Sequence, residues 1–192
     1  RKDNARAEPS WFNAPVPSFG QDNARLLIVG LAPGRGGANK TGRPFTGDWA
    51  GDLLYATLLK FGFAEGEYKE RADDGLQLID CMISNAVRCV PPENKPTPAE
   101  AATCRPFLVD RIASLPNLKV MVALGRVAHE AAVRTVGAAL TKYPFAHGAQ
   151  HILPNGVALF DSFHCSRYNT NTRRLTTEMF EDVFKAVRDH LR

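Results

Sequence analysis

The sequence has no apolar run long enough to cross a membrane, and its first residues do not resemble a signal peptide. Its four cysteines in 192 residues do not suggest a disulfide-rich secreted scaffold. No repeat or low-complexity tract divides the chain. We therefore expect one globular domain over residues 1–192, soluble, cytoplasmic, not bound to membranes and most simply monomeric. Because Arg1 opens a polar segment without a methionine, we expect that residues precede it in the natural protein.

Two common phosphate-binding motifs are also missing. The segment 30–48, GLAPGRGGANKTGRPFTGD, contains neither the Gly-Lys-Ser/Thr of a P-loop nor GxGxxG, which argues against a nucleotide site of either kind. It nevertheless joins the apolar strand 26–29 to a helical pattern that starts at Trp49. Such a loop places backbone N–H groups close to a ligand, although a glycine-rich surface loop without a ligand is the alternative.

Strand and helix patterns alternate along the chain. We predict strands at 26–29, 77–84, 118–124 and 157–160, and helices at 49–61, from 97 or 98, at 126–136 and at 176–191. This order is typical of an α/β fold, a three-layer α/β/α sandwich with a central four-stranded parallel sheet. The loops that follow the strands then meet at one edge of the sheet.

The charge of the chain is modestly positive, with a net +4. Residues 30–47 and 164–177 contain basic side chains and no acidic ones. These two loops permit a polyanionic partner, while solvated surface charge remains the alternative for each residue.

Three segments carry a resemblance to a known family: residues 30–48, residues 84–104 (SNAVRCVPPENKPTPAEAATC) and residues 163–176 (FHCSRYNTNTRRLT). Together they resemble the uracil-DNA glycosylase superfamily, and within it family 5, the iron–sulfur enzymes that remove uracil and related deaminated bases. The similarity covers nearly the whole chain. Leu31 and Asp48 favour family 5 over family 4, which usually has an acidic residue at the first position and no aspartate at the second.

The resemblance implies a monofunctional DNA glycosylase that initiates base excision repair. Its partner is DNA that contains uracil, and hypoxanthine, xanthine and ethenocytosine are further candidate bases. The motifs assign no lysine as an amine nucleophile, which is the reason for predicting hydrolysis without strand cleavage. A noncatalytic nucleic-acid-binding module and a redox iron–sulfur protein are the alternatives.

The family pattern implies two catalytic residues. Asp48 would stabilise the sugar cation and orient or deprotonate water, and His164 would donate a hydrogen bond to uracil O2. Asp48 also fits the N-cap of the helix at Trp49, and both roles are compatible. His164 stands in His-Cys-Ser, where the family commonly has His-Pro-Ser, and a solvated or phosphate-binding histidine is its alternative role.

The resemblance also implies a pocket for a base that is flipped out of the duplex. Gly30, Leu31 and Ala32 would line it. Phe45 would stack on the base, or would otherwise be a core aromatic behind the loop. Asn85 would bind the Watson–Crick edge of uracil, or would otherwise form a turn at the end of its strand.

DNA phosphates would be bound by side chains from both basic loops. The candidates are Lys40, Arg43, Ser166, Arg167, Tyr168, Asn169 and Arg173. Arg167 or Tyr168 is also a candidate to fill the gap left by the flipped base.

Cys89 and Cys104 flank a proline-rich loop, and by resemblance they supply two ligands of a [4Fe-4S] cluster. The family's other two ligands lie in an N-terminal Cys-x-x-Cys, which we expect in a segment before Arg1. From spacing alone, two such cysteines are more often unremarkable. Cys81 falls on a predicted strand and is expected to be a buried core thiol.

Overall fold

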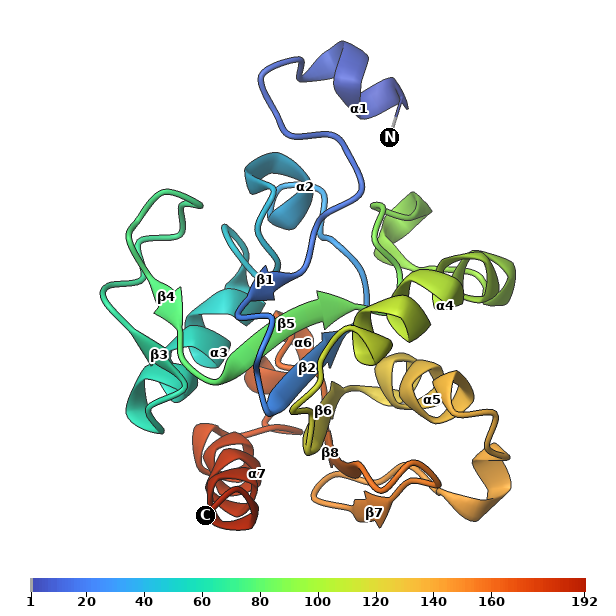
Figure 1. The fold of residues 1–192 in the computed structure, drawn as a ribbon. Helices are drawn as coiled ribbons and strands as arrows, with labels where there is room; N and C mark the ends of the chain where they lie inside the picture. The colour runs from blue at the N-terminus through green and yellow to red at the C-terminus, as the bar shows by residue number, and fades with distance from the viewer. Residues whose placement is uncertain (1) are drawn as a thin grey trace.

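The structure is a computed structural model that describes the backbone of residues 2–192 and the side chains from residue 4 onward. Its described part is built on a sheet with strand order β1-β5-β2-β6-β8-β7 (Figure 1). The strands of this sheet are β1 (Phe19–Gly20), β2 (Leu26–Gly30), β5 (Cys81–Asn85), β6 (Val120–Leu124), β7 (Gln150–Ile152) and β8 (Ala158–Ser162). A separate antiparallel pair consists of β3 (Ala64–Glu65) and β4 (Gln77–Leu78).

Strands β5, β2, β6 and β8 run parallel, and every residue in them is buried. Continuous apolar runs form such strands because both faces of the sheet are covered. These are the four strands predicted from the sequence, with small shifts of their ends.

Helices cover both faces of the sheet (Figure 1). The longer helices are α3 (Trp49–Lys60), α4 (Pro98–Ala113), α5 (Arg126–Thr135) and α7 (Thr177–His190), and the shorter ones are α1 (Lys2–Ala7), α2 (Ala38–Thr41) and α6 (Arg167–Asn171), with 3₁₀ turns at Pro92–Asn94 and Leu140–Lys142. Leu26 and Ile28 of β2 pack in the cluster of α3 and α7, whereas Leu27 and Val29 pack in the cluster of α4 and α5. The predicted three-layer α/β/α sandwich is confirmed.

The prediction of four strands is incomplete, because the sheet of the described residues has six. The additional strands, β1 and β7, pair antiparallel with the outer parallel strands β5 and β8. They are two and three residues long, too short to give an alternating sequence pattern. Short strands of this kind cover the edges of a sheet.

Two predicted segments are subdivided. The predicted strand 77–84 is broken at Asp80, whose φ of 53° turns the chain between β4 and β5. The carboxylate of Asp80 accepts hydrogen bonds from the backbone and side chain of Arg25. The predicted loop 161–172 contains α6, which Ser166 caps by accepting a hydrogen bond from the Asn169 amide.

Across residues 2–192, none of the helices combines the length and the apolar character that crossing a bilayer requires.

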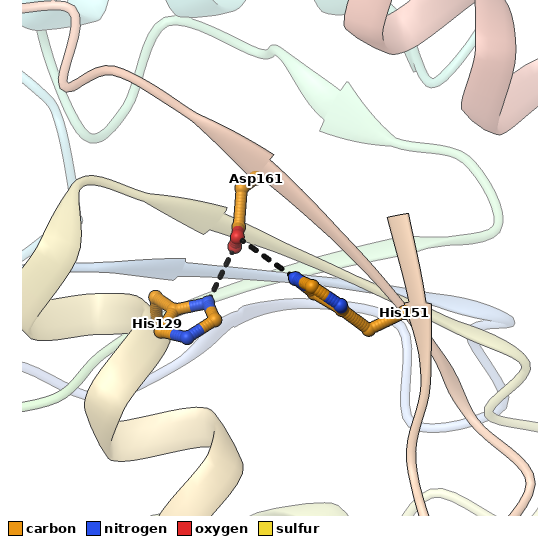
Figure 2. A group of neighbouring side chains, drawn as sticks. All are labelled: His129, His151 and Asp161. Carbon is orange, nitrogen blue, oxygen red and sulfur yellow. Dashed lines mark hydrogen bonds and ion pairs between the residues drawn. The ribbon is translucent and has the colours of Figure 1, made fainter. Parts of the chain in front are cut away.

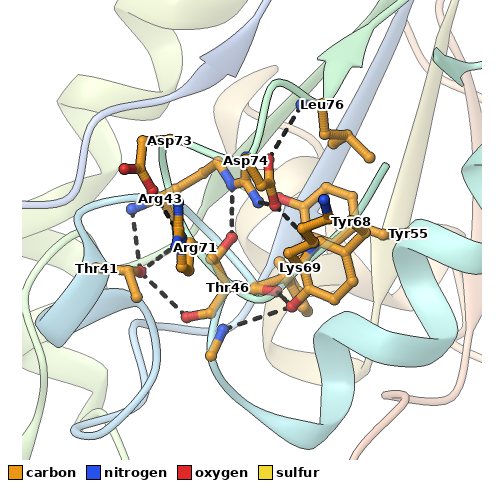
Figure 3. Close-up of polar contacts among 12 residues, drawn as sticks. Thr41, Arg43, Thr46, Tyr55, Tyr68, Lys69, Arg71, Asp73, Asp74 and Leu76 are labelled. Atoms are coloured by element: carbon orange, nitrogen blue, oxygen red, sulfur yellow. Dashed lines mark hydrogen bonds and ion pairs between the residues drawn. The ribbon is translucent and has the colours of Figure 1, made fainter. Parts of the chain in front are cut away.

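Arg43 ties the glycine-rich loop to the segment that precedes β4 (Figure 3). Its guanidinium donates to both carboxylate oxygens of Asp74, at 2.8 and 2.7 Å, and to the Thr46 hydroxyl at 2.7 Å. The rings of Tyr55 and Tyr68 lie 5.3 and 5.8 Å from it. The Arg43 and Asp74 side chains are only 4% and 0% exposed, so this is a buried, bidentate ion pair.

We expect Asp74→Asn to lower the free energy of unfolding by about 3–5 kcal/mol at pH 7, because it leaves the buried Arg43 charge without its partner. Urea denaturation measures the change. Asp73→Asn is the matched control, since Asp73 is 80% exposed and pairs with Arg71 at the surface. That control should lose no more than about 1 kcal/mol. Equal losses in the two variants would contradict the assignment.

The same ion pair makes the free energy of unfolding depend on pH. The guanidinium of Arg43 holds the pKa of the Asp74 carboxyl well below its usual 3.8. The stabilisation is therefore complete above about pH 3.8, the value in the unfolded chain, and is lost as the pH falls further. The stability difference between the wild-type protein and Asp74→Asn should narrow over that acid range.

Candidate active site

The parallel strands end at one edge of the sheet and bring the motif loops together there. Gly30 at the end of β2 is in register with Asn85 at the end of β5, and Leu124 of β6 is in register with Ser162 of β8. The loops that follow these strands carry the glycine-rich segment, the proline-rich segment and His164. This arrangement is the one expected for the ligand crevice of an open α/β sheet.

A pocket of about 600 Å³ opens at this edge. It is lined by Leu31, Ala32, Gly34, Ala38, Phe45, Asp48, Ala50, Asn85, Glu93, Asn94, Lys95, His164, Ser166 and Tyr168. Much of its wall is apolar, with a few polar side chains that converge on it, which is typical of a small-molecule site.

Gly30, Phe45 and Asn85 pack tightly at the inner end of the pocket. A Cβ on Gly30 would lie 2.6 Å from the Phe45 ring and would also collide with Asn85 Oδ1, so only glycine fits there. Phe45 has a φ of 53° and is 7% exposed, yet it still lines the pocket. Phe45 therefore belongs to the core and also faces the pocket, and its stacking on a base stays a prediction.

Asn85 presents an unused acceptor. The residue is 6% exposed, and among the described groups its Oδ1 has no hydrogen-bond partner. A buried amide oxygen without a partner is costly unless a ligand or water supplies the donor. This atom marks the inner wall of the pocket as a place for polar recognition.

Asp48 serves as a helix cap and also lines the pocket. It is the N-cap of α3, and its Oδ1 accepts from the Gly51 amide at 3.3 Å. Burial raises the pKa of its carboxyl above the usual 3.8, and the backbone hydrogen bonds oppose this shift. The backbone of Gly34 and Gly37 packs against the carboxylate, where a Cβ at either position would crowd it.

His164 lines the pocket next to Phe45. The two rings are stacked with centroids 6.1 Å apart. Desolvation lowers the pKa of His164 to about 4, so the imidazole is neutral at pH 7. The carbonyl of His164 accepts from Asn169 Nδ2 at 2.8 Å, and the next residue, Cys165, is fully buried. The contact of the His164 carbonyl with Asn169 and the burial of Cys165 thus fix the loop that carries the imidazole.

Four of the seven predicted DNA contacts lie at the surface: Lys40, Arg167, Tyr168 and Arg173. Tyr168 is 71% exposed at the pocket rim, and the guanidinium of Arg167 lies 5.0 Å from the ring of Trp49. These side chains are available to a polyanion.

The prediction that Arg43 binds DNA phosphates is wrong. Its guanidinium is buried and fully engaged with Asp74 and Thr46, because a charge inside an aromatic core requires a partner. Ser166 and Asn169 have roles inside the chain, the hydroxyl as the cap of α6 and the amide as a donor to the His164 carbonyl.

The four cysteines fall into two groups by burial. Cys81 and Cys165 are fully buried, whereas Cys89 after β5 and Cys104 on α4 are half-buried. The predicted core position of Cys81 is confirmed. Asn4 of α1 lines a surface pocket together with residues 90–94 of the proline-rich loop, so the N-terminal helix lies beside the loop that begins after Cys89.

Sequence reasoning missed several residues of the site. Glu93, Asn94 and Lys95 line the pocket from the proline-rich loop, and the first two have positive φ angles of 53° and 56°. Trp49 does not line the pocket itself but follows Asp48, is 45% exposed and donates from its indole to the Thr170 hydroxyl. Trp49 could have been considered because it directly follows Asp48 in the sequence. Nothing in the sequence indicated that the turn at residues 93–95 folds toward the pocket.

Sequence comparison places the chain among known proteins. The profile described as the uracil DNA glycosylase superfamily matches residues 17–188. A type-5 uracil-DNA glycosylase of Thermus thermophilus is 47% identical over 183 residues, which cover 95% of this chain and 83% of that protein. A type-5 uracil-DNA glycosylase of Mycobacterium tuberculosis is 43% identical over 190 residues, which cover 97% of this chain and 70% of that protein.

The fold is also similar to a solved structure, that of wild-type Pedobacter heparinus SMUG2. The TM-score is 0.53 with 18% sequence identity, over 87% of this chain and 77% of the other, which supports the fold alone. Together the matched profile and the similar relatives give the conclusion that the chain belongs to the uracil DNA glycosylase superfamily, within its type-5 group.

Proposed function

We propose that this protein is a monofunctional uracil-DNA glycosylase that hydrolyses the N-glycosidic bond of a base flipped into the pocket at the sheet edge. The observation that carries the proposal is the convergence of Asp48, Asn85 and His164 on one pocket of about 600 Å³. A base within a duplex must leave the stack to reach such a pocket. The similarity to type-5 uracil-DNA glycosylases supports uracil as the base.

Recognition of the base is assigned to Asn85 and Phe45. The Asn85 amide offers both an acceptor and a donor, which match the N3–H and O4 of uracil. Cytosine has an amino group and an unprotonated N3 at these positions, and it would leave buried groups unpaired at about 1–3 kcal/mol each. Phe45 supplies an aromatic wall beside the base. The N1–H and O6 of hypoxanthine and xanthine offer the same donor and acceptor, and we propose these two deaminated bases as further substrates. Ethenocytosine lacks this edge, and we propose it only on the resemblance to the family.

Bond cleavage places positive charge on the sugar and negative charge on the leaving base. The carboxylate of Asp48 would stabilise the sugar cation and would orient or deprotonate the attacking water. His164 is neutral at pH 7 and therefore has one N–H, which would donate to O2 of the base as charge develops there. The two residues act on opposite ends of the breaking bond.

Strand cleavage requires an amine nucleophile, and Lys95 is a lysine in the pocket wall. It is exposed, so it lacks the desolvation that activates such an amine. We therefore propose simple hydrolysis. Exposed Lys40, Arg167 and Arg173 would bind phosphates, and Tyr168 or Arg167 at the rim would fill the gap in the duplex.

The half-buried pair Cys89 and Cys104 fits two thiolate ligands of a [4Fe-4S] cluster. The buried pair Cys81 and Cys165 does not, because both thiols are enclosed in the core. The contact of Asn4 with the pocket at residues 90–94 brings the N-terminal helix to the same loop. We propose that ligands from a segment before Arg1 complete the site and that the cluster braces this loop.

Asp48→Asn tests the catalytic assignment. Asparagine is as good an N-cap as aspartate, so α3 keeps its cap while the charge is lost. Base release from a duplex with a single uracil, followed as alkali-revealed strand cleavage, should fall by about a hundredfold to ten-thousandfold in kcat. Because burial disfavours the ionised carboxyl, the free energy of unfolding at pH 7 should not fall.

Thr176→Ala is the matched control for this test. It removes the N-cap of α7 at about 1 kcal/mol of stability, and Thr176 does not line the pocket. It should leave base release unchanged. Full activity in Asp48→Asn would reject the role of the carboxylate, and no release from any duplex by the wild-type holoprotein would favour the noncatalytic binding module.

Asn85→Ala tests base recognition. Loss of the buried amide should lower kcat/KM for uracil by about tenfold to a hundredfold, since one or two hydrogen bonds are removed. Duplexes with hypoxanthine, xanthine, ethenocytosine and the four normal bases measure the breadth of the pocket. Asn39→Ala is the control, because Asn39 is equally buried but does not line the pocket. Identical rates on uracil for both variants would contradict the role of Asn85.

Cys104→Ser tests the cluster in the full-length protein. Iron and acid-labile sulfide per chain should fall together in this variant, because one thiolate ligand is missing. Cys81→Ser removes a thiol of the core and should leave both contents unchanged in the folded fraction. Unaltered iron in Cys104→Ser would reject this ligand.

A further inference from the structure

A second cluster of polar side chains lies behind the sheet edge, outside the pocket. His129 of α5, His151 of β7 and Asp161 of β8 point toward one another (Figure 2). One ligand atom from each lies within 4.8 Å of the others. Their side chains are 2%, 14% and 0% exposed. No step of the proposed reaction uses these residues.

The hydrogen bonds of His129 fix its tautomer. Its Nε2 lies 2.8 Å from the carbonyl oxygen of Tyr143, and because a carbonyl only accepts, Nε2 must carry a hydrogen. In the neutral ring, Nδ1 then has a lone pair, and it faces Asp161 Oδ1 at 2.8 Å. Two lone pairs at this distance repel, so a positive centre must lie between them.

A proton on His129 satisfies only part of the cluster. It accounts for the contact between Nδ1 and Oδ1, but not for the second contact of the cluster. Asp161 Oδ2 and His151 Nε2 are 3.6 Å apart, which is an ion-pair distance too long for a hydrogen bond, and within residues 4–192 neither atom has a hydrogen-bond partner. Two buried polar atoms that face each other without a hydrogen bond indicate a group that both of them bind.

We propose that His129 Nδ1, His151 Nε2 and Asp161 bind a divalent transition-metal ion of the zinc class. Two imidazoles and one carboxylate are a ligand set that Zn²⁺ favours, with the fourth position open to water. Tetrahedral ligands at zinc distances lie about 3.3 Å apart. His129 Nδ1 lies 2.8 Å from Asp161 Oδ1 and His151 Nε2 lies 3.6 Å from Asp161 Oδ2, so the two histidines approach different oxygens of the same carboxylate at distances on either side of that value.

The surroundings have the form of a metal site. Metal-binding histidines usually donate their other ring N–H to a carbonyl or carboxylate, and His129 does so to Tyr143. The three ligands come from three different elements, so the ion would join α5, β7 and β8. Asp161 lies three residues before His164 in the chain. The ion would therefore brace the end of β8, from which the His164 loop begins.

Zinc content of the purified holoprotein tests the site. Wild-type protein, His151→Ala and His190→Ala are incubated with excess Zn²⁺, desalted and analysed for zinc per chain by elemental mass spectrometry. His190 is a surface histidine of α7 and serves as the matched control. Thiolates that take up zinc contribute equally in all three proteins, so only the difference is interpreted.

We expect wild type and His190→Ala to retain one zinc per chain more than His151→Ala. Added Zn²⁺ should also raise the unfolding temperature of wild type more than that of His151→Ala, since an ion that binds the folded state stabilises it. Equal zinc contents with equal thermal shifts in the three proteins would overturn the proposal and leave a protonated His129–Asp161 pair. Metal content is read independently of base release, so failure here leaves the proposed function intact.

Discussion

The buried ion pair between Arg43 and Asp74 is the interaction on which the shape of the glycine-rich loop depends. It fixes the loop at the residue that precedes Pro44 and Phe45, and the hydroxyls of Tyr55 and Tyr68 donate to the carbonyls of those two residues. Phe45 is thereby held in a left-handed conformation that costs about 1–3 kcal/mol. Without these contacts the loop would relax, and the aromatic wall of the pocket would be lost.

Asp48 shows how stability and chemistry compete in the same loop. Capping α3 favours the folded state, but the burial of its carboxyl raises the pKa and so disfavours the ionised form that the proposed catalytic role requires. The chain keeps the carboxylate close to glycine backbone, where the amides of Gly51 and Ala50 offset part of the desolvation. An asparagine would cap the helix equally well, so capping alone does not account for aspartate at this position.

Features that follow from the local sequence pattern could be predicted from the sequence, whereas contacts between residues far apart in the chain could not. The four parallel strands and the main helices follow from apolar runs and helical periodicity, and the placement of Asp48, Asn85 and His164 at one edge follows from the topology of such a sheet. Arg43 was misassigned because its partner lies 31 positions away in a loop, and local sequence does not reveal such pairings. The turn at residues 93–95 was missed for another reason: its direction depends on positive φ angles in Glu93 and Asn94, and a glutamate gives no sequence signal for such an angle.

Polar contacts made by residues that do not line the pocket hold it from two sides. On the β2 side, Arg43 and Asp74 secure the loop that carries Phe45 and Asp48. On the β8 side, Asp161 Oδ1 lies 2.8 Å from His129 Nδ1 of α5 just before the chain turns into the His164 loop, and Asn169 donates to the carbonyl of His164 itself. Hydrolysis of a glycosidic bond benefits when charged and polar groups are already in place before the reaction, because they need not reorganise as charge develops. Buried polar pairs add little net stability, so their value in this fold lies in the fixed positions of the residues that follow them.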